Sequence, residues 1–335
     1  MSADTTAWRL GSNASAGDPL EAAIRALSDA DGLYLLVDPA LADRVVDVPE
    51  FQALPRQVLP INTLTADRRP YLLSLGSAAR NERALNASLR LSFDEARGLL
   101  DTESGQPRSV CAWLILRDRN TPPPIAALAQ SATARPPHWA TVTFRFWDPR
   151  VMEHLPRALG TAHVGAWLGS LGIAQWWSVV AQPDSGYSLA CLEARADVSR
   201  DQQRPRTLMG AADRDQWRLL NAIGWANRLA TIVSNWELAD SPNHDELERL
   251  AHRAMAWGLN DDADVLRFSH CTLTLHPAFD THPKVASVLK QLQLSDQPGF
   301  AELVQSWDDA FLDELRSGAW INPLSMPAQA LVASE

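Results

Sequence analysis

The stretch "TVTFRFWDPRV", residues 141–151, predicts a strand that runs directly into a helix. Side chains that alternate in character over residues 139–147 are typical of a β-strand, whose successive side chains point to opposite faces of the sheet. The dipeptide Asp148-Pro149 then joins a good helix N-cap to a residue suited to the first helical position. This part of the chain is therefore expected to contain both strands and helices.

The expected strand has a core face and a second face. The core face is expected to hold Ala140, Val142, Phe144 and Phe146. The second face is expected to hold Thr141, Thr143, Arg145 and Trp147. Neither strand propensity nor capping requires Arg145 or Arg150, because a cation in the first turn of a helix is mildly unfavourable. The two arginines are expected either to pair with Asp148 or a neighbouring acid and so fix the junction, or to meet the carboxylates of a partner. Together with Trp147 they are candidate partner-binding residues.

The segment "LYLLVDPAL", residues 33–41, repeats this pattern, with a buried strand over Leu33–Val37 and a short helix expected after Asp38-Pro39. Further strands are expected at 71–75 and 110–117, the second central in its sheet because its residues are nearly all apolar. The remaining expected elements of this lobe are helices at 19–30, 92–101, within 119–137 and at 161–171, and a hairpin at 176–193. The helix at 92–101 is expected to begin at a capping box formed by Ser92 and Glu95. We expect an α+β lobe with a central sheet.

From about residue 210 the pattern becomes helical, with apolar residues at helical spacing. Helices are expected over 212–238, 243–257 with Gly258 as its stop, 261–274 capped by Asn260, 284–293 opened by Pro283, and 299–316. The expected organisation is an N-terminal helical segment 1–30, an α+β domain 31–194, a linker 195–210, a helical domain 211–320 and a flexible tail 321–335.

Composition excludes several classes of protein. The formal net charge of −10 argues against nucleic-acid binding, and no apolar run approaches the roughly 18 residues of a membrane span. Residues 1–190 carry 17 basic and 19 acidic side chains, whereas residues 191–335 carry 13 and 21, so the acidity lies in the second lobe. The first residues do not form a secretory signal, and three widely spaced cysteines do not suggest disulfides, so a cytoplasmic location is expected.

Known catalytic and cofactor-binding motifs are missing from the sequence. It contains no GxSxG elbow, no phosphate-binding GxxxxGK[ST] loop and no GxGxxG after a strand, so no cofactor is expected. The best candidate set of metal ligands is His270, His276, Asp280 and His282. The three histidines are six residues apart, a spacing that does not place them on one face of a helix. We therefore expect turn residues there and not a metal site. Glu153-His154 could be an acid–base couple, although adjacent helical residues point about 100° apart.

Two groups of motifs resemble the domain of unknown function 4123 family. "FRFWDPRV" (144–151) resembles the family signature FRFYDPRV, with Trp147 in place of tyrosine, and "LYLLVDPAL" is similar to the family's first strand. The resemblance covers about residues 30–182. "RAMAWGLNDDADVLRFSHCTLTLHPAFDTHP" (253–283) is similar to the helical extension that follows this domain in many members.

The resemblance implies an adaptor chaperone of bacterial type VI secretion, without catalytic activity. Such proteins bind a toxic effector and help load it onto the valine-glycine-repeat spike protein. We expect the effector's N-terminal segment to bind in a cleft formed by both lobes, with exposed Trp and Leu as anchors. The candidate partner-binding residues are Arg145, Trp147, Arg150, Trp176 and Trp257, and the structural motif comprises Phe144, Phe146, Asp148, Pro149, Asp38 and Pro39.

Two alternatives remain open. The first is an immunity or scaffold protein that neutralises the toxin rather than delivering it. The second is a hydrolase with a site around Glu153, His154 and the histidines of the helical lobe.

Overall fold

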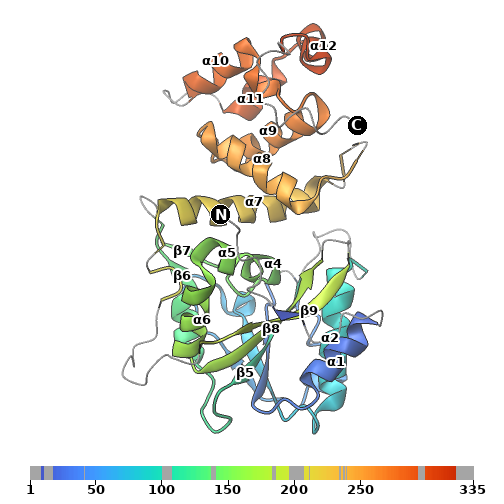
Figure 1. The fold of residues 1–335 in the computed structure, drawn as a ribbon, viewed down its shortest axis with the longest axis vertical. Helices are drawn as coiled ribbons and strands as arrows, with labels where there is room; N and C mark the ends of the chain where they lie inside the picture. The colour runs from blue at the N-terminus through green and yellow to red at the C-terminus, as the bar shows by residue number, and fades with distance from the viewer. Residues whose placement is uncertain are drawn as a thin grey trace. The chain divides into compact units, whose positions relative to one another are not determined.

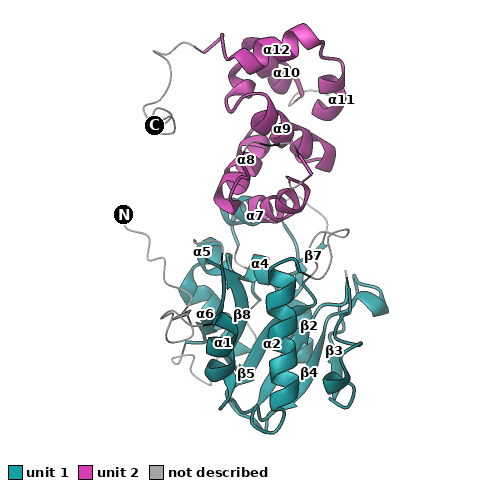
Figure 2. Cartoon of the chain, turned by 90° about the vertical axis from the view of Figure 1, so that its right-hand side faces the viewer, with its two compact units in different colours: residues 1–220 teal, residues 221–335 magenta. Residues whose placement is uncertain are grey.

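The chain forms an α+β fold, as predicted, with a seven-stranded sheet in its first part and helices in the remainder (Figure 1). A computed structural model describes residues 9–10, 18–40, 42–99, 108–136, 141–182, 186–195, 207–210, 212–233, 235–236, 238, 240–292 and 299–321. The chain divides into two compact units, unit 1 (residues 1–220) and unit 2 (residues 221–335), coloured separately in Figure 2. Among the described residues, no helix has the length and apolar character that crossing a membrane requires.

The sheet of unit 1 is antiparallel throughout, and its strand order is β1-β9-β8-β5-β2-β4-β3. Its strands are β1 (Arg9–Leu10), β2 (Leu33–Val37), β3 (Arg56–Val58), β4 (Tyr71–Gly76), β5 (Val110–Leu116), β8 (Ile173–Ala181) and β9 (Tyr187–Glu193). The apolar strand β5 lies at the centre, as its sequence predicted, and β8 and β9 form the predicted hairpin.

Helices cover both faces of this sheet. On one face, α1 (Pro19–Leu27) and α2 (Glu82–Ala96) pack against apolar side chains of β2, β4 and β5, whereas α6 (Thr161–Ser170) lies on the other side (Figure 1). The alternation of side chains along β8 divides two neighbouring tryptophans between the faces. Trp177 joins the core under α1 and α2, and Trp176 packs against Trp167 of α6. Both faces of the sheet are therefore hydrophobic cores.

The helix expected to begin at Ser92 and run to about 101 was predicted wrongly. Residues 92–96 instead form the last turn of α2, which begins at Glu82. The Glu95 carboxylate accepts hydrogen bonds from the backbone N–H groups of Ser109 and Val110, at 3.0 and 3.1 Å. Glu95 does not act in a capping box. Its carboxylate binds the backbone N–H groups at the start of β5, a tertiary contact that the local sequence does not reveal.

The strand expected over 139–147 is much shorter than predicted. Only β7 (Val142–Thr143) is a strand, and it pairs with β6 (Thr133–Ala134) in a separate two-stranded sheet, while residues 139 and 140 lie outside the described residues. The backbone turns after Phe144, so Phe146 and Trp147 are both fully buried instead of facing opposite sides. Tertiary packing of large aromatic side chains has here overridden the alternation of the sequence.

Short helices complete the described part of unit 1. They are α3 (Ile125–Ser131), α4 (Pro149–Met152), α5 (Leu155–Leu159) and the 3-10 turns η1 (Pro49–Phe51) and η2 (Ala66–Arg68). The linker expected over 195–210 lies mostly outside the described residues, and the boundary between the units falls within α7 (Arg214–Val233).

The described part of unit 2 is helical. Its helices after α7 are α8 (His244–Ala256), α9 (Asp262–Thr274), η3 (Phe279–Thr281), α10 (Pro283–Leu292), α11 (Phe300–Gln305) and α12 (Asp309–Ser317). Gly258 has a φ of 79° just past the end of α8, as expected for a helix stop. The cap of α9 is Asp261 rather than Asn260, and the helix expected over 299–316 is divided into α11 and α12.

Candidate functional site

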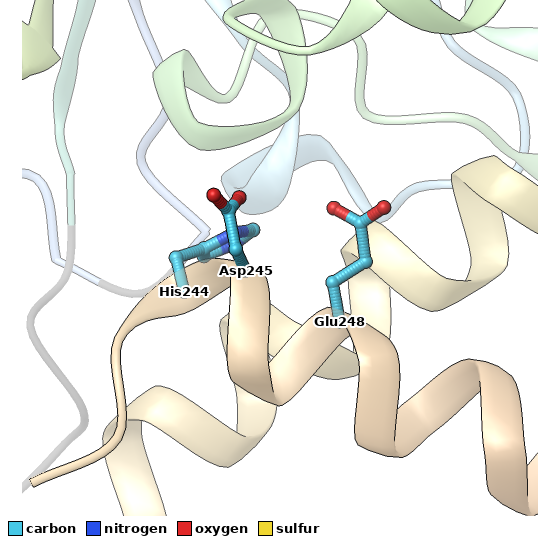
Figure 3. Close-up of side chains that lie close together, drawn as sticks. All are labelled: His244, Asp245 and Glu248. Carbon is cyan, nitrogen blue, oxygen red and sulfur yellow. The ribbon is translucent and has the colours of Figure 1, made fainter. Parts of the chain in front are cut away.

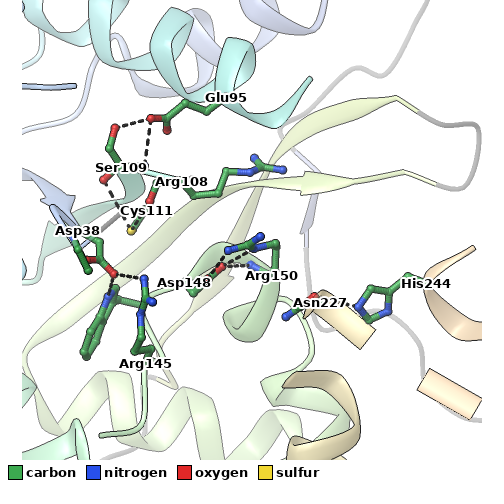
Figure 4. A network of polar contacts seen from close by, with 12 residues as sticks. Asp38, Glu95, Arg108, Ser109, Cys111, Arg145, Asp148, Arg150, Asn227 and His244 are labelled. Atoms are coloured by element: carbon green, nitrogen blue, oxygen red, sulfur yellow. Dashed lines mark hydrogen bonds and ion pairs between the residues drawn. The ribbon is translucent and has the colours of Figure 1, made fainter. Parts of the chain in front are cut away.

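A buried carboxylate joins the two motifs of unit 1 (Figure 4). Asp38, which follows β2 and is only 3% exposed, accepts a hydrogen bond from the Arg145 guanidinium at 2.6 Å and one from the Trp147 indole N–H at 2.5 Å. Its other oxygen accepts from the backbone N–H of Ala40. No helix opens at Pro39, contrary to prediction, because Asp38 caps only a turn and serves chiefly as the partner of residues more than 100 positions away.

The junction after Trp147 has the predicted local structure. The Asp148 carboxylate accepts from the backbone N–H of Arg150, and Pro149 occupies the first helical position of α4. Arg150 also forms a two-pronged ion pair with Asp148 through Nε at 3.0 Å and Nη2 at 2.8 Å. Burial alone would raise the pKa of Asp148, but the Arg150 charge and hydrogen bonds outweigh it and lower this pKa. Arg145 and Arg150 are thus each paired within the chain.

Two of the predicted partner-binding tryptophans lie in the core of unit 1. Trp147 and Trp176 are both fully buried, and each packs against Phe146, with ring centroids 5.4 and 6.1 Å apart. Phe144, expected in the core, is half-buried and its ring lies edge-on to Trp217. Neither buried tryptophan is presented at the surface of this structure as an anchor for a partner.

Unit 2 contains a second buried aspartate with the same set of donors. Asp280 is 3% exposed and receives both Nε and Nη2 of Arg253, and the Trp257 indole N–H donates to it at 2.8 Å. Arg253 additionally donates to the backbone carbonyl of Pro277. Trp257, a predicted partner-binding residue, is half-buried and packs against the core of this unit. We call these two arrangements, Asp38 with Arg145 and Trp147, and Asp280 with Arg253 and Trp257, the aspartate clamps.

The histidines of unit 2 serve separate structural contacts. His276 Nδ1 accepts from the backbone N–H of Ala278, His282 lies 3.1 Å from Glu314, and His270 packs edge-on against Trp236. Since Asp280 is held by its clamp, the candidate ligand set of the sequence does not converge on one point. Within the described ranges, these side chains form no shared metal-ligand group.

One group that the sequence did not single out brings possible metal ligands together. Atoms of His244, Asp245 and Glu248, at the start of α8, lie within 4.8 Å of one another (Figure 3). The ring nitrogen Nε2 of His244 is 3.0 Å from the Asn227 side-chain oxygen, and Asn243 and Glu246 cap the helix beside it. Because the N-terminus of a helix carries partial positive charge, this location favours anions over cations. The group is therefore a weak candidate for metal binding.

The pKa of Glu153 is strongly perturbed. This residue lies in the turn between α4 and α5, where burial raises its pKa to about 7 despite a hydrogen bond from the backbone N–H of Ala181 and the nearby charges of Arg108 and Arg157. The three cysteines are buried, and burial raises the pKa of Cys111 well above its usual value. A raised carboxyl pKa is compatible with acid–base chemistry, but it also arises from burial alone.

The Glu153 carboxyl should make folding stability fall with rising pH. Its pKa is higher in the folded state than its ordinary value of 4.5, so the folded state holds the proton more tightly, and stability is lost as the pH rises from about 4.5 to about 7. Between these two pH values, the free energy of unfolding of Glu153→Gln should fall by about 1–2 kcal/mol less than that of the unsubstituted protein. Urea unfolding across this pH range would measure it, with Glu50→Gln, at an exposed position, as the control. An unchanged slope in Glu153→Gln would contradict the expectation.

Comparison with known proteins adds no relative. No family model, curated protein or solved structure matches this chain. The resemblance to the adaptor family therefore depends on the motif residues themselves, and these can be located in the structure.

Proposed function

We propose that this protein is a non-catalytic adaptor that binds a toxic effector of type VI secretion and promotes its loading onto the spike protein. The proposal derives from the resemblance of residues 30–182 and 253–283 to the adaptor family. The proposed partners are therefore the effector, through its N-terminal segment, and the spike, while nucleic acid and membranes are not proposed as partners. The proposed location is the cytoplasm.

The observation that supports this proposal most is the pairing of motif residues in the aspartate clamps. Asp38 belongs to "LYLLVDPAL", and its partners Arg145 and Trp147 belong to "FRFWDPRV". In unit 2, Arg253 and Asp280 lie near the two ends of the second region of resemblance. The residues that carry the resemblance thus contact one another inside each unit and are not scattered over its surface.

Unit 2 offers a surface that suits a partner's side chains. A hollow of about 390 Å³ is lined by Pro242, Leu250, Leu273 and Pro277 and bordered by Asp240, Glu246, Arg249 and Arg253. An apolar floor with a charged rim is the arrangement in which a few anchor residues supply affinity and charges supply specificity. Leu273 is half-buried in this hollow and is the residue through which we propose to test it.

Co-purification tests the proposal directly. The full chain, mixed with the toxin and the spike encoded beside it, is expected to co-elute with the toxin on size-exclusion chromatography. Leu273→Asp is expected to weaken toxin binding at least about tenfold, since charge buried in an apolar contact costs more than 1.4 kcal/mol. Glu302→Gln, at an exposed position on α11, is the control. Co-elution with neither protein would refute the adaptor proposal.

Deletion of the gene separates the adaptor from an immunity protein. If the protein is an adaptor, a strain lacking it should survive and stop secreting the toxin. Death of the producing strain would favour the immunity alternative instead. Toxin in the culture supernatant and viability of the producer are the two measurements.

A further inference from the structure

Arg108 is a buried arginine that has no anionic partner among the residues that the structure describes. It directly precedes the central strand β5 and is 9% exposed. Its Nη2 lies 3.5 Å from the Ala96 carbonyl oxygen, at the limit of a hydrogen bond, and its buried Nε and Nη1 have no acceptor. Among the described residues, no carboxylate lies within ion-pair distance of this guanidinium.

The acidic groups around Arg108 are each engaged elsewhere. Asp148 receives two nitrogens of Arg150, Asp38 is held in its clamp, and Glu95 accepts from Ser109 and Val110 (Figure 4). Glu153 accepts from the backbone of Ala181. Among the described residues, none of these carboxylates forms an ion pair with Arg108. The charges of Asp148 and Glu95 act on it from a greater distance and do not outweigh its burial.

The other groups beside Arg108 favour an anion. Burial, and next the positive charge of Arg150, lower the pKa of Arg108, and they outweigh Tyr187, Asp148 and Glu95, which raise it. The Tyr187 ring, on β9, lies with its centroid 5.4 Å from the Arg108 guanidinium carbon. Two guanidinium groups beside an aromatic wall make a polarised, mostly dehydrated site, in which an oxyanion binds through charge-assisted hydrogen bonds.

A buried, unpaired charge is among the most unfavourable features that a fold can retain, and it becomes favourable once a counter-charge binds. We propose that Arg108, with Arg150 and Tyr187 beside it, binds an oxyanion with phosphate or carboxylate chemistry. The site is separate from the aspartate clamps, whose arginines already have partners. It does not depend on the proposed adaptor function.

Thermal unfolding of the full chain with inorganic phosphate or acetate, against sodium chloride at matched ionic strength, tests this proposal. At roughly tenfold excess over the dissociation constant, the bound anion should raise the Tm by about 3–6 °C. Arg108→Gln should abolish this rise. Arg90→Gln, at an exposed position on α2, makes the same change of charge and should keep it. A rise with phosphate only identifies a phosphate site, and a rise with acetate identifies a site that also accepts carboxylates.

Several outcomes would overturn the proposal. One is the absence of any rise with either anion in the unsubstituted protein, and another is an equal rise in Arg108→Gln, which would indicate a general salt effect. If Arg108→Gln does not fold, equilibrium dialysis of labelled phosphate and labelled acetate against the unsubstituted protein decides. Binding of about one labelled anion per chain, reversed by an excess of either unlabelled phosphate or unlabelled acetate, supports the site. The absence of binding refutes it.

Discussion

Replacing Asp38 by alanine is expected to lower the free energy of unfolding of unit 1 by about 2–4 kcal/mol. The substitution breaks an ion pair whose carboxylate is buried, but the Arg145 side chain is 36% exposed, so water can compensate part of the loss. The substitution leaves the Arg145 guanidinium and the Trp147 indole N–H without their shared acceptor. Urea unfolding followed by circular dichroism measures the loss. Hydrogen exchange at β2 and β5 assigns it to unit 1.

Two variants make the Asp38 result specific. Asp47→Ala removes an exposed aspartate nearby and should change stability by less than about 0.5 kcal/mol. The double variant Asp38→Ala, Arg145→Met removes both charges and should recover part of the loss, because the partly buried Arg145 charge is then no longer left without a counter-charge. A double variant no more stable than Asp38→Ala would show that the ion pair is not the source of the effect.

Replacing Asp280 by alanine is expected to have a comparable effect on unit 2. Arg253 would lose two hydrogen bonds and its ion pair, and Trp257 would lose its acceptor. Since Arg253 is 33% exposed, water can compensate part of the loss, and we expect about 2–4 kcal/mol. Hydrogen exchange at α8 and α9 is the measurement.

The control for Asp280 is Asp309→Ala, which removes an exposed carboxylate in the first turn of α12 and should cost at most about 1 kcal/mol. If Asp280→Ala were as mild as this control, the second clamp would not stabilise unit 2. Loss of protection at β2 and β5 in Asp280→Ala would contradict the assignment of this clamp to unit 2 alone.

The elements that the sequence predicted well are those determined by local chemistry. The apolar run at 110–117 and the Asp148-Pro149 cap behave as expected, because burial and capping depend on neighbouring residues. The second Asp-Pro pair, Asp38-Pro39, has the same local chemistry and opens no helix. Its carboxylate is drawn to Arg145 and Trp147, which the sequence places 107 and 109 residues away.

The candidate site shows the same limit. The sequence singles out Arg145 and Arg150 because strand and helix formation do not require them. Arg150 pairs locally with Asp148, whereas the partner of Arg145, Asp38, is brought to it only by the tertiary structure. Trp147 was placed on the wrong face because the strand ends earlier than its alternating pattern predicts. Arg108 belongs to no sequence motif. Only the structure shows that it is buried and that the neighbouring carboxylates are bound to other groups.

The strand order of unit 1 also constrains when this protein can fold during its synthesis. β1 pairs with β9, joining Arg9 to Cys191, and the central strand β5 receives its second neighbour only when β8 is made. At typical translation rates, the apolar strand β2 leaves the ribosome roughly 8–30 s before the last strand of its sheet. The nascent chain must keep these strands from associating with other chains during this interval, whereas the helices of unit 2 can pack against neighbours made moments earlier.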